Sequence, residues 1–362
     1  MTLPLELQEK LNNLAHALID QKKARVIVPA QDQSTGFWFG GGNMIESAEG
    51  DLYLVGRYRN FGDSRTGIGA GERGLELSIF QSSDQGDSFE KILKWSKADL
   101  NVGETPVLSI EGSALRWTDQ GVELLVSTEK DNIGYPQEVE GFLKPGTGVW
   151  TIDSIKADSV ERLKNASVTP FLSSQEPNWL HVKDPFVYSN PQSGSTVFCC
   201  THPFNWASSN TAFVDPEGTL VSDFFPRGMS WDVAMTRGTA LLDVPMVGAF
   251  EEIDATLVFY DGGECVRDLD QHKEAVTRPR GYSCEELGGL AFFSDGDLSQ
   301  IHRISRHFPS FISPYGTGCS RYVDVFPTSR GLIATWQQSQ DDGSQPLVMN
   351  ILSNAEVESI LA

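Results

Sequence analysis

Cysteine is scarce in this sequence, and its spacing excludes the common zinc-binding patterns. The 362 residues include five cysteines, and no two of them form a Cys-x-x-Cys pair. A structural zinc site is therefore not expected. Cys199 and Cys200 are adjacent in an apolar run, where a thiol behaves as a small buried hydrophobe. We expect reduced thiols, no metal and no cofactor.

Long apolar runs and positive charge are also in short supply. No segment approaches the roughly 20 apolar residues that a membrane span needs, and residues 1–30 lack the basic and apolar segments of a secretory signal. The 28 lysines and arginines are outnumbered by 49 acidic residues, and the net charge of −21 would repel nucleic-acid phosphates. We therefore expect no nucleic-acid or membrane partner. We also expect a cytoplasmic protein, or a secreted one whose signal has been removed.

The composition is instead typical of many short strands. The sequence contains 34 glycines, 20 phenylalanines and eight tryptophans. Near the N-terminus, Leu7, Leu11, Leu14 and Leu18 fall on one face of a helix. These observations predict an all-β protein with a short N-terminal helix.

Residues 82–89 form the most informative motif, which reads S-S-D-Q-G-D-S-F between two alternating runs. A turn of this composition predicts a β-hairpin. In that turn Asp84 accepts backbone hydrogen bonds, Gly86 takes a positive φ, and Phe89 anchors the tip. The motif resembles the Asp-box hairpin of sialidases and related β-propellers, in which the aspartate is structural. An exposed hairpin in another all-β fold is the alternative.

Beyond residue 30 the chain repeats a unit made of a polar lead-in, an apolar strand, a turn and further strands. Five such units start near residues 43, 111, 184, 237 and 321. Units of four strands at this spacing predict a radial propeller. We therefore expect residues 1–30 to form a helical segment and residues 31–362 to form a single five-bladed β-propeller, with six blades as the alternative.

Polar residues recur at the starts of these units. The innermost strands of a propeller start near one end of its axial channel, so residues at the starts converge on one funnel. The five starts carry an amide, two carboxylates and two guanidiniums, namely Asn43, Glu111, Asp184, Arg237 and Arg321. Each residue alone is typical of a turn or a cap, but together they indicate a shared site.

Two of these starts carry short motifs. Glu111-Gly112-Ser113 and Lys183-Asp184-Pro185 resemble signatures of five-bladed propeller glycoside hydrolases of families 43, 32 and 117. The resemblance implies hydrolysis of a glycosidic bond in a poly- or oligosaccharide. It also implies a glutamate that donates a proton, with aspartates as base or nucleophile and as orienting group. Glu111 and Asp184 are then the candidate catalytic pair.

The sequence departs from that family pattern. The first blade offers Asn43 where an aspartate is usual, and the glutamate precedes the aspartate instead of following it. A third catalytic carboxylate must come from elsewhere, and we assign Asp63, with Glu72 and Asp232 as alternatives. Asp63 lies in the glycine-rich segment 60–74, which we expect to be a long loop over the channel mouth.

Arginines predict the charge of the substrate. Arg57 and Arg59 lie two residues apart on one predicted strand and so face the same side, while Arg237 and Arg321 head later blades. Guanidinium groups bind carboxylates and sulfates bidentately, so we expect an anionic carbohydrate. One alternative is that they pair with the protein's own acidic residues. Another is that they hold the carboxylate of a sialic acid, as three arginines do in the sialidases that the chain resembles.

Two further residues are candidates for substrate binding. His202 and His181, together with Tyr58, Tyr282 or Tyr322, offer the acid and base of a polysaccharide lyase, and a satisfied core histidine is the alternative. Trp231 lies in a loop near a blade start and suits stacking on a sugar ring or closure of one blade on the next. A non-catalytic carbohydrate-binding propeller is the alternative to an enzyme.

Overall fold

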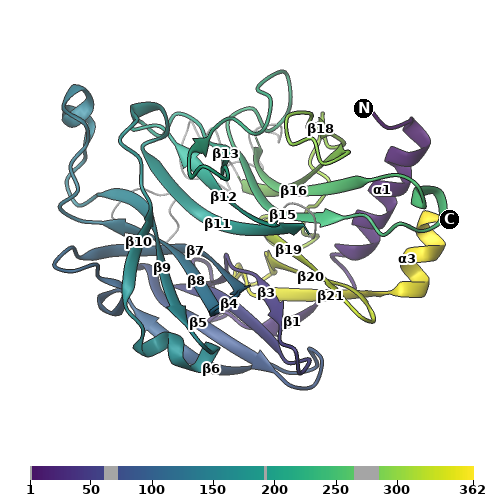
Figure 1. Cartoon of the computed structure of the whole chain (residues 1–362), viewed down its shortest axis with the longest axis horizontal. Helices are drawn as coiled ribbons and strands as arrows, with labels where there is room; N and C mark the ends of the chain where they lie inside the picture. Colours follow the sequence, from purple (N-terminus) through teal and green to yellow (C-terminus); the bar gives the residue numbers. More distant parts are fainter. Residues whose placement is uncertain (1, 61–71, 191–193, 265–284) are drawn as a thin grey trace.

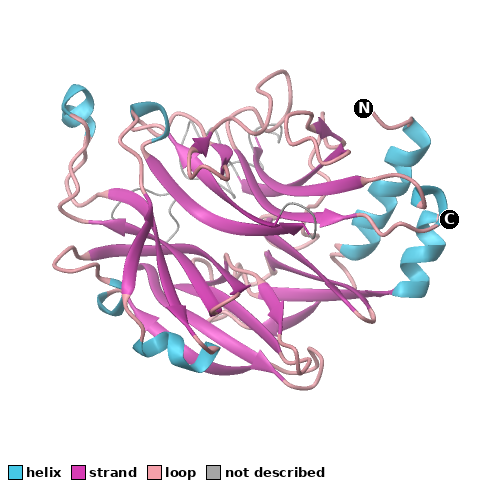
Figure 2. Ribbon diagram, in the orientation of Figure 1, coloured by secondary structure: helices cyan, strands magenta, loops and turns pink. Residues whose placement is uncertain are grey.

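The computed structural model describes residues 2–60, 72–190, 194–264 and 285–362, and its architecture is five antiparallel sheets around a central axis (Figures 1 and 2). Four sheets have four strands, and one has five because its inner strand is divided. The fold is the five-bladed β-propeller that the sequence predicts. No sixth sheet occurs within the described residues.

The blades follow the chain in order, from an inner to an outer strand. Blade 1 contains β2 (Trp38–Gly40), β3 (Met44–Glu46), β4 (Leu52–Asn60), β5 (Glu72–Ser82) and β6 (Glu90–Ser96). Blade 2 contains β7 (Val107–Thr118), β8 (Gly121–Lys130), β9 (Val149–Ala157) and β10 (Val168–Leu172). Blade 3 contains β11 (His181–Asn190), β12 (Gly194–His202), β13 (Asn210–Val214) and β14 (Leu220–Val221).

The last two blades complete the ring. Blade 4 contains β15 (Thr236–Asp243), β16 (Ala255–Glu264), β17 (Glu285–Ser294) and β18 (His302–Arg303). Blade 5 contains β19 (Ser320–Thr328), β20 (Gly331–Gln338), β21 (Leu347–Ser353) and, as its outer strand, β1 (Arg25–Val28). Short 3-10 helices in the connections are η2 (Ala98–Leu100), η3 (Gln137–Phe142), η4 (Val160–Asn165), η5 (Pro177–Trp179) and η6 (Gly248–Phe250).

The inner strands of all five blades are irregular where they approach the axis. Their register against the next strand shifts between Ile110 and Ser113, Lys183 and Phe186, Gly238 and Ala240, and Arg321 and Asp324. In blade 1 the inner strand is broken between β2 and β3. A β-bulge turns side chains away from the alternating directions that they have in a regular strand. Asp184 and Tyr322 lie in two of them, each with a φ of 53°.

The N-terminal segment is part of the propeller, which corrects the division at residue 30. Helix α1 (Leu5–Leu18) forms as predicted and buries Leu11, Leu14 and Leu18. It lies beside α3 (Asn354–Leu361), at the edge where blades 4 and 5 meet (Figure 1). After α1 the chain continues into β1, which pairs with β21 as the outer strand of blade 5. A strand from the N-terminal segment therefore completes the last blade.

The predicted hairpin at residues 82–89 joins β5 to β6. The backbone N–H of Ser88 donates to Oδ1 of Asp84 at 2.9 Å, and that of Gly86 donates to Oγ of Ser82 at 2.8 Å. Gly86 has a φ of 93°, and Phe89 packs against the core below. Asp84 therefore has the structural function expected of it, while kinship with the Asp box stays a prediction.

The glycine-rich segment is shorter than predicted at both ends. Strand β4 extends to Asn60 and β5 begins at Glu72, so that Glu72–Gly74 belong to a strand. Asp63, the predicted third catalytic carboxylate, lies outside the described residues. Residues 61–71 of the loop segment that was predicted to cover the channel mouth also lie outside the described residues.

Candidate active site

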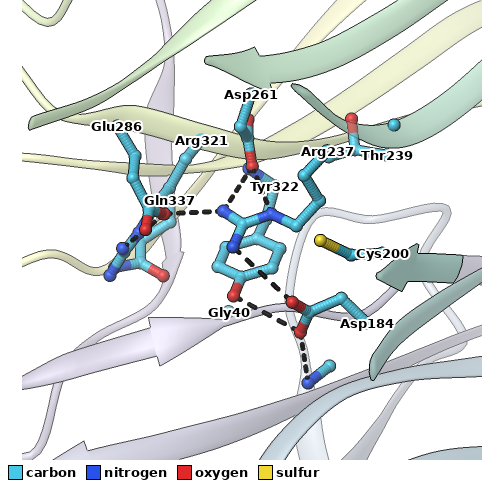
Figure 3. Close-up of polar contacts among 12 residues, drawn as sticks. Gly40, Asp184, Cys200, Arg237, Thr239, Asp261, Glu286, Arg321, Tyr322 and Gln337 are labelled. Atoms are coloured by element: carbon cyan, nitrogen blue, oxygen red, sulfur yellow. Dashed lines mark hydrogen bonds and ion pairs between the residues drawn. The ribbon is translucent and has the colours of Figure 1, made fainter. Parts of the chain in front are cut away.

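Four of the five polar blade starts meet at the axis around Tyr322. Figure 3 shows Asp184, Arg237 and Arg321 converging on this tyrosine, together with Asp261 and Glu286 from blade 4. Glu111 joins the same group through Arg57, which contacts both Glu111 and the Tyr322 hydroxyl. We call this group the axial cluster: Arg57, Glu111, Lys183, Asp184, Arg237, Asp261, Glu286, Arg321 and Tyr322.

Glu111 is bound by Arg57 from the neighbouring blade. Nε of Arg57 donates to Oε2 of Glu111 at 2.8 Å, and Nη2 of Arg57 contacts the same oxygen. Burial by itself would raise the pKa of Glu111, but the charges of Arg57, Lys183 and Arg59 lower it well below its usual range. The Glu111 side chain is 12% exposed. It is therefore an ionised carboxylate that a ligand can reach.

Asp184 lies deeper, on the floor of the cluster. Oδ1 of Asp184 accepts a hydrogen bond from the Gly112 backbone N–H at 2.9 Å and one from the Tyr322 hydroxyl at 3.5 Å. Oδ2 lies 3.6 Å from Nζ of Lys183 and 3.5 Å from Nη1 of Arg237. A Cβ on Gly112 would lie 2.6 Å from Oδ1 of Asp184. Gly112 of the Glu111-Gly112-Ser113 motif therefore leaves the space that the side chain of Asp184 occupies.

Glu286 connects the two arginines that head blades 4 and 5. Its Oε2 accepts from Nη2 of Arg237 at 2.6 Å and from Nη1 of Arg321 at 2.7 Å. Burial would raise the pKa of Glu286, but the two guanidiniums hold it well below its usual range. The side chain is 23% exposed. Glu286 is therefore a second ionised carboxylate at the open side of the cluster.

Asp261 binds Arg237 as Glu286 does, but it is fully buried. It accepts from Nη2 of Arg237 at 2.6 Å and from the Tyr322 backbone N–H at 3.1 Å. Burial raises the pKa of Asp261 to about 6, although Arg237 opposes the rise. Its position below Arg237 and Tyr322 suits it to hold both residues in place.

Arg59 shares the axial side of β4 with Arg57, as predicted. Both side chains are buried, and Cζ of Arg59 lies 4.6 Å from the centroid of the Trp38 ring. Cζ of Arg321 lies 4.4 Å from the same ring. The charge of Arg59 acts on Glu111, so all four predicted arginines lie in or beside the axial cluster.

Three other predicted residues lie outside the axial cluster. Asn43 exchanges hydrogen bonds with the backbone of Leu115 at 2.9 and 2.7 Å, which ties blade 1 to blade 2. Trp231 is buried in an aromatic cluster, where its Nε1 donates to the Ser305 carbonyl at 2.7 Å. The alternative carboxylate Asp232 is also buried and accepts from Nε of Arg303 at 2.9 Å.

His202 lies next to the cluster, in contact with Trp206 and Cys200. His181 stacks on the same Trp206 ring at 4.2 Å. Burial and the charge of Lys183 lower the pKa of His181 to about 3 and the pKa of His202 well below its usual range. Both imidazoles are therefore neutral at physiological pH, and both contact the Trp206 ring.

Four residues of the cluster were not expected from the sequence. Lys183 appeared only as the first letter of a motif, and Tyr322 only as a partner in the lyase alternative. Asp261 and Glu286 lie on the second and third strands of blade 4, where no blade-start rule applies. An acidic residue directly after the apolar run Ala255–Tyr260 was the available signal for Asp261.

Two kinds of feature do not occur among the described residues. No group of three or more histidine, cysteine, aspartate or glutamate side chains there is arranged to hold a metal ion. In the same residues, neither helix combines the length and apolar character required to span a bilayer.

No protein-family model matches this sequence, and no curated protein matches it. Among solved structures, the chain is similar to a glycoside hydrolase at 12% identity and a TM-score of 0.59, with 96% of this chain and 95% of that one covered. It is also similar to an alpha-L-arabinofuranosidase from Lactobacillus brevis at 10% identity, with a TM-score of 0.55 and 89% and 92% covered. A thermostable family-43 glycoside hydrolase has 11% identity and a TM-score of 0.52, with 89% and 91% covered. At these identities the likeness shows the five-bladed fold alone.

Proposed function

We propose that this protein is a glycoside hydrolase that cleaves an anionic poly- or oligosaccharide at the axial cluster. The observation that carries the proposal is the meeting of four polar blade starts around Tyr322, which brings Asp184 together with two partly exposed carboxylates, Glu111 and Glu286. Carboxyl groups in contrasting environments are what glycosidic hydrolysis requires. The glycoside hydrolases that share the fold support the reaction class.

The charges around the carboxylates indicate different catalytic roles for them. Arg57 keeps Glu111 ionised, so Glu111 acts as base or nucleophile and not as the proton donor that the motif resemblance implies. Asp184 accepts hydrogen bonds from the Gly112 backbone N–H and the Tyr322 hydroxyl and serves to orient the site, while Asp63, the remaining predicted carboxylate, lies outside the described residues.

The charge of the axial cluster supports an anionic substrate. Its four basic side chains (Arg57, Lys183, Arg237 and Arg321) match its four carboxylates, and the charge of Arg59 acts alongside them. Positive side chains are thus gathered at the axis within a protein of net charge −21. The pKa of Asp261 is raised to about 6, so protonation of Asp261 adds one positive charge to the cluster as the pH falls below that value. A uronate or sulfate group would be drawn to Arg321 and Arg237, where Glu286 is the group it must displace.

A carbohydrate-binding propeller without catalysis is the second candidate, and one observation favours it. Both partly exposed carboxylates of the cluster, Glu111 and Glu286, have a lowered pKa because of their arginine partners. Neither therefore carries a proton at neutral pH, so a binding site that needs no proton donor also fits the described residues.

Release of reducing ends from polygalacturonate and from neutral arabinan tests the proposal. We expect the wild-type protein to cleave the anionic polymer faster, and Glu111→Gln and Asp184→Asn each to lose at least about a hundredfold of the rate, as expected for groups in general acid–base roles. Glu138→Gln, an exposed residue of η3, is the matched control and should keep full activity. Circular dichroism and melting curves check that each variant is folded.

Three outcomes would contradict the proposal. Cleavage that survives in Glu111→Gln would remove Glu111 from the chemistry. Products that absorb in the ultraviolet would mean elimination by a lyase. Saccharide binding without any cleavage would favour the non-catalytic alternative.

A further inference from the structure

A groove of about 370 Å³ lies on blade 3, separate from the axial cluster. This volume is within the range of small-molecule sites. Its lining includes two aromatic residues, two amides and one charged pair, namely Trp179 and Phe204, Asn178 and Asn205, and Asp223 and Arg227. A small number of polar groups beside flat rings is the composition of a saccharide site.

The groove is held in shape by hydrogen bonds beneath it. Asn210 is 2% exposed, and its Nδ2 donates to Oδ1 of Asp223 at 3.1 Å and to the Phe225 carbonyl at 2.9 Å. On the other wall, the backbone N–H of Phe204 donates to the Pro177 carbonyl at 2.9 Å. The segment with Asp223 is thus tied to β13, and the segments with Pro177 and Phe204 are tied to each other, so a ligand would have less of the groove to order.

The charged groups of the groove neutralise each other. Nε and Nη2 of Arg227 donate to Oδ1 of Asp223 at 3.1 and 2.9 Å, and no other charged residue lines the groove among the described residues. The Asn178 amide is exposed, and within the described part of the chain it makes no side-chain hydrogen bond. The groove therefore offers rings and amide groups without net charge.

Trp206 connects the groove with the axial cluster. Asn205 and Ala207 line the groove on either side of Trp206 in the sequence. Nζ of Lys183 lies 5.9 Å from the centroid of the Trp206 ring, and the same Nζ lies 3.6 Å from Oδ2 of Asp184. Trp206 thus lies between two groove residues in the sequence and near the Lys183–Asp184 pair in space.

We infer that this blade 3 groove binds an uncharged sugar unit of the same saccharide whose anionic unit occupies the axial cluster. The inference rests on the proposed function for the identity of the axial ligand, and it makes the substrate an oligosaccharide of mixed charge. Trp179 and Phe204 supply the stacking surface, while Asn178 and Asn205 bind the hydroxyl groups.

A glycan array that carries neutral and uronate-containing mono- to hexasaccharides tests the inference by binding alone. The wild-type protein should bind trisaccharides and longer chains that contain a neutral unit, and Trp179→Ala should bind these about tenfold more weakly, a loss of the size that one stacking contact provides. Binding of monosaccharides should not change. Trp117→Ala is the control, because Trp117 is 42% exposed on blade 2, away from the groove.

The results separate this inference from the proposed function. Equal binding by Trp179→Ala and the wild type, binding that does not depend on chain length, or no binding on the array would each overturn the groove as a saccharide site. If Trp179→Ala lost binding while the wild type cleaved no glycan, the groove would stand and the hydrolase proposal would fall. If Glu111→Gln lost cleavage while Trp179→Ala bound normally, the reverse would hold.

Discussion

The guanidinium carbon of Arg237 lies 4.0 Å from the centroid of the Tyr322 ring. The two residues come from adjacent inner strands, β15 and β19, and they share Asp261, which accepts from the Arg237 side chain and from the Tyr322 backbone N–H. The ring and the guanidinium therefore cannot shift independently. Since the Tyr322 hydroxyl also contacts Arg57 and Asp184, this tyrosine couples blades 1, 3, 4 and 5 at the axis.

Tyr322→Phe should lower turnover while leaving the fold intact. The variant keeps the ring under Arg237 but loses the hydroxyl contacts at 3.2 Å to Nη2 of Arg57 and at 3.5 Å to Oδ1 of Asp184. We expect kcat to fall about tenfold, which corresponds to about 1.4 kcal/mol, with little change in melting temperature. Steady-state kinetics beside the control Tyr315→Phe measures this. An unchanged kcat would show that the hydroxyl only supports packing.

Gly112→Ala should disable the axial cluster through Asp184. The new Cβ would lie 2.6 Å from Oδ1 of Asp184, closer than any real contact, so the aspartate or the strand must move. We expect a loss of at least about tenfold in kcat/KM, as displacements of about 1 Å produce in preorganised sites. Gly134→Ala is the matched control, since no heavy atom lies within 4 Å of its added Cβ. Equal activity of the two variants would mean that Asp184 needs no fixed position.

Removing Glu111 should also reveal how Arg57 is stabilised. The Arg57 side chain is 3% exposed, so Glu111→Gln leaves a buried guanidinium without its main counterion. We expect the free energy of unfolding to fall by about 3 kcal/mol. The double variant Arg57→Met with Glu111→Gln should recover most of that loss, because the buried charge is gone. Urea denaturation measures both, and a double variant no more stable than Glu111→Gln would contradict the argument.

The propeller itself was predictable because its signals are local. Short apolar runs at regular spacing, an Asp/Gly hairpin and an amphipathic helix are visible in a few residues each, and the strands formed where the sequence places them. Strand β1 was missed because Arg25–Val28 is only four residues long and pairs with β21, more than 300 residues away in the chain. A local sequence pattern does not indicate which distant strand will pair with a short segment.

The candidate site was predictable only where it lies on inner strands. Glu111, Asp184, Arg237 and Arg321 share a position in the repeat, so the convergence of blade starts identifies them. Asn43 has the same position, but the break between β2 and β3 turns it to the Leu115 backbone. Asp261 and Glu286 reach the cluster from β16 and β17, and this depends on how blade 4 packs against blade 5.

Asp324 should make the stability of the protein depend on pH. Its Oδ2 accepts the Met44 backbone N–H at 2.8 Å, across the junction of blades 5 and 1. Burial raises the pKa of Asp324 from 3.8 to about 7, although the Met44 hydrogen bond opposes the rise. Between those two values the folded protein holds a proton that the unfolded chain releases, so the contribution to stability falls as the pH rises from about 4 to about 7.

Asp324→Asn should remove this dependence. The amide oxygen still accepts from Met44 but cannot ionise, so we expect the variant to gain stability relative to the wild type at pH 7 and little at pH 4. Chemical denaturation across this pH range measures the difference, with the exposed Asp119→Asn as control. A constant difference between Asp324→Asn and the wild type at every pH would show that Asp324 does not titrate in this window.

Arg321 should distinguish anionic from neutral substrates. Its guanidinium lies 4.4 Å from the Trp38 ring and donates to Glu286, a partly exposed carboxylate. A substrate carboxylate that takes the place of Glu286 would gain a charge-assisted contact of about 1.5–3 kcal/mol. Arg321→Ala should therefore raise KM for an anionic glycan about ten- to a hundredfold, with a smaller effect on kcat, and leave KM for a neutral glycan nearly unchanged. The control is Arg162→Ala, which removes an exposed arginine paired with Asp158. Equal effects of Arg321→Ala on both glycans would mean that Arg321 serves only to neutralise Glu286, and that the axial cluster does not select for charge.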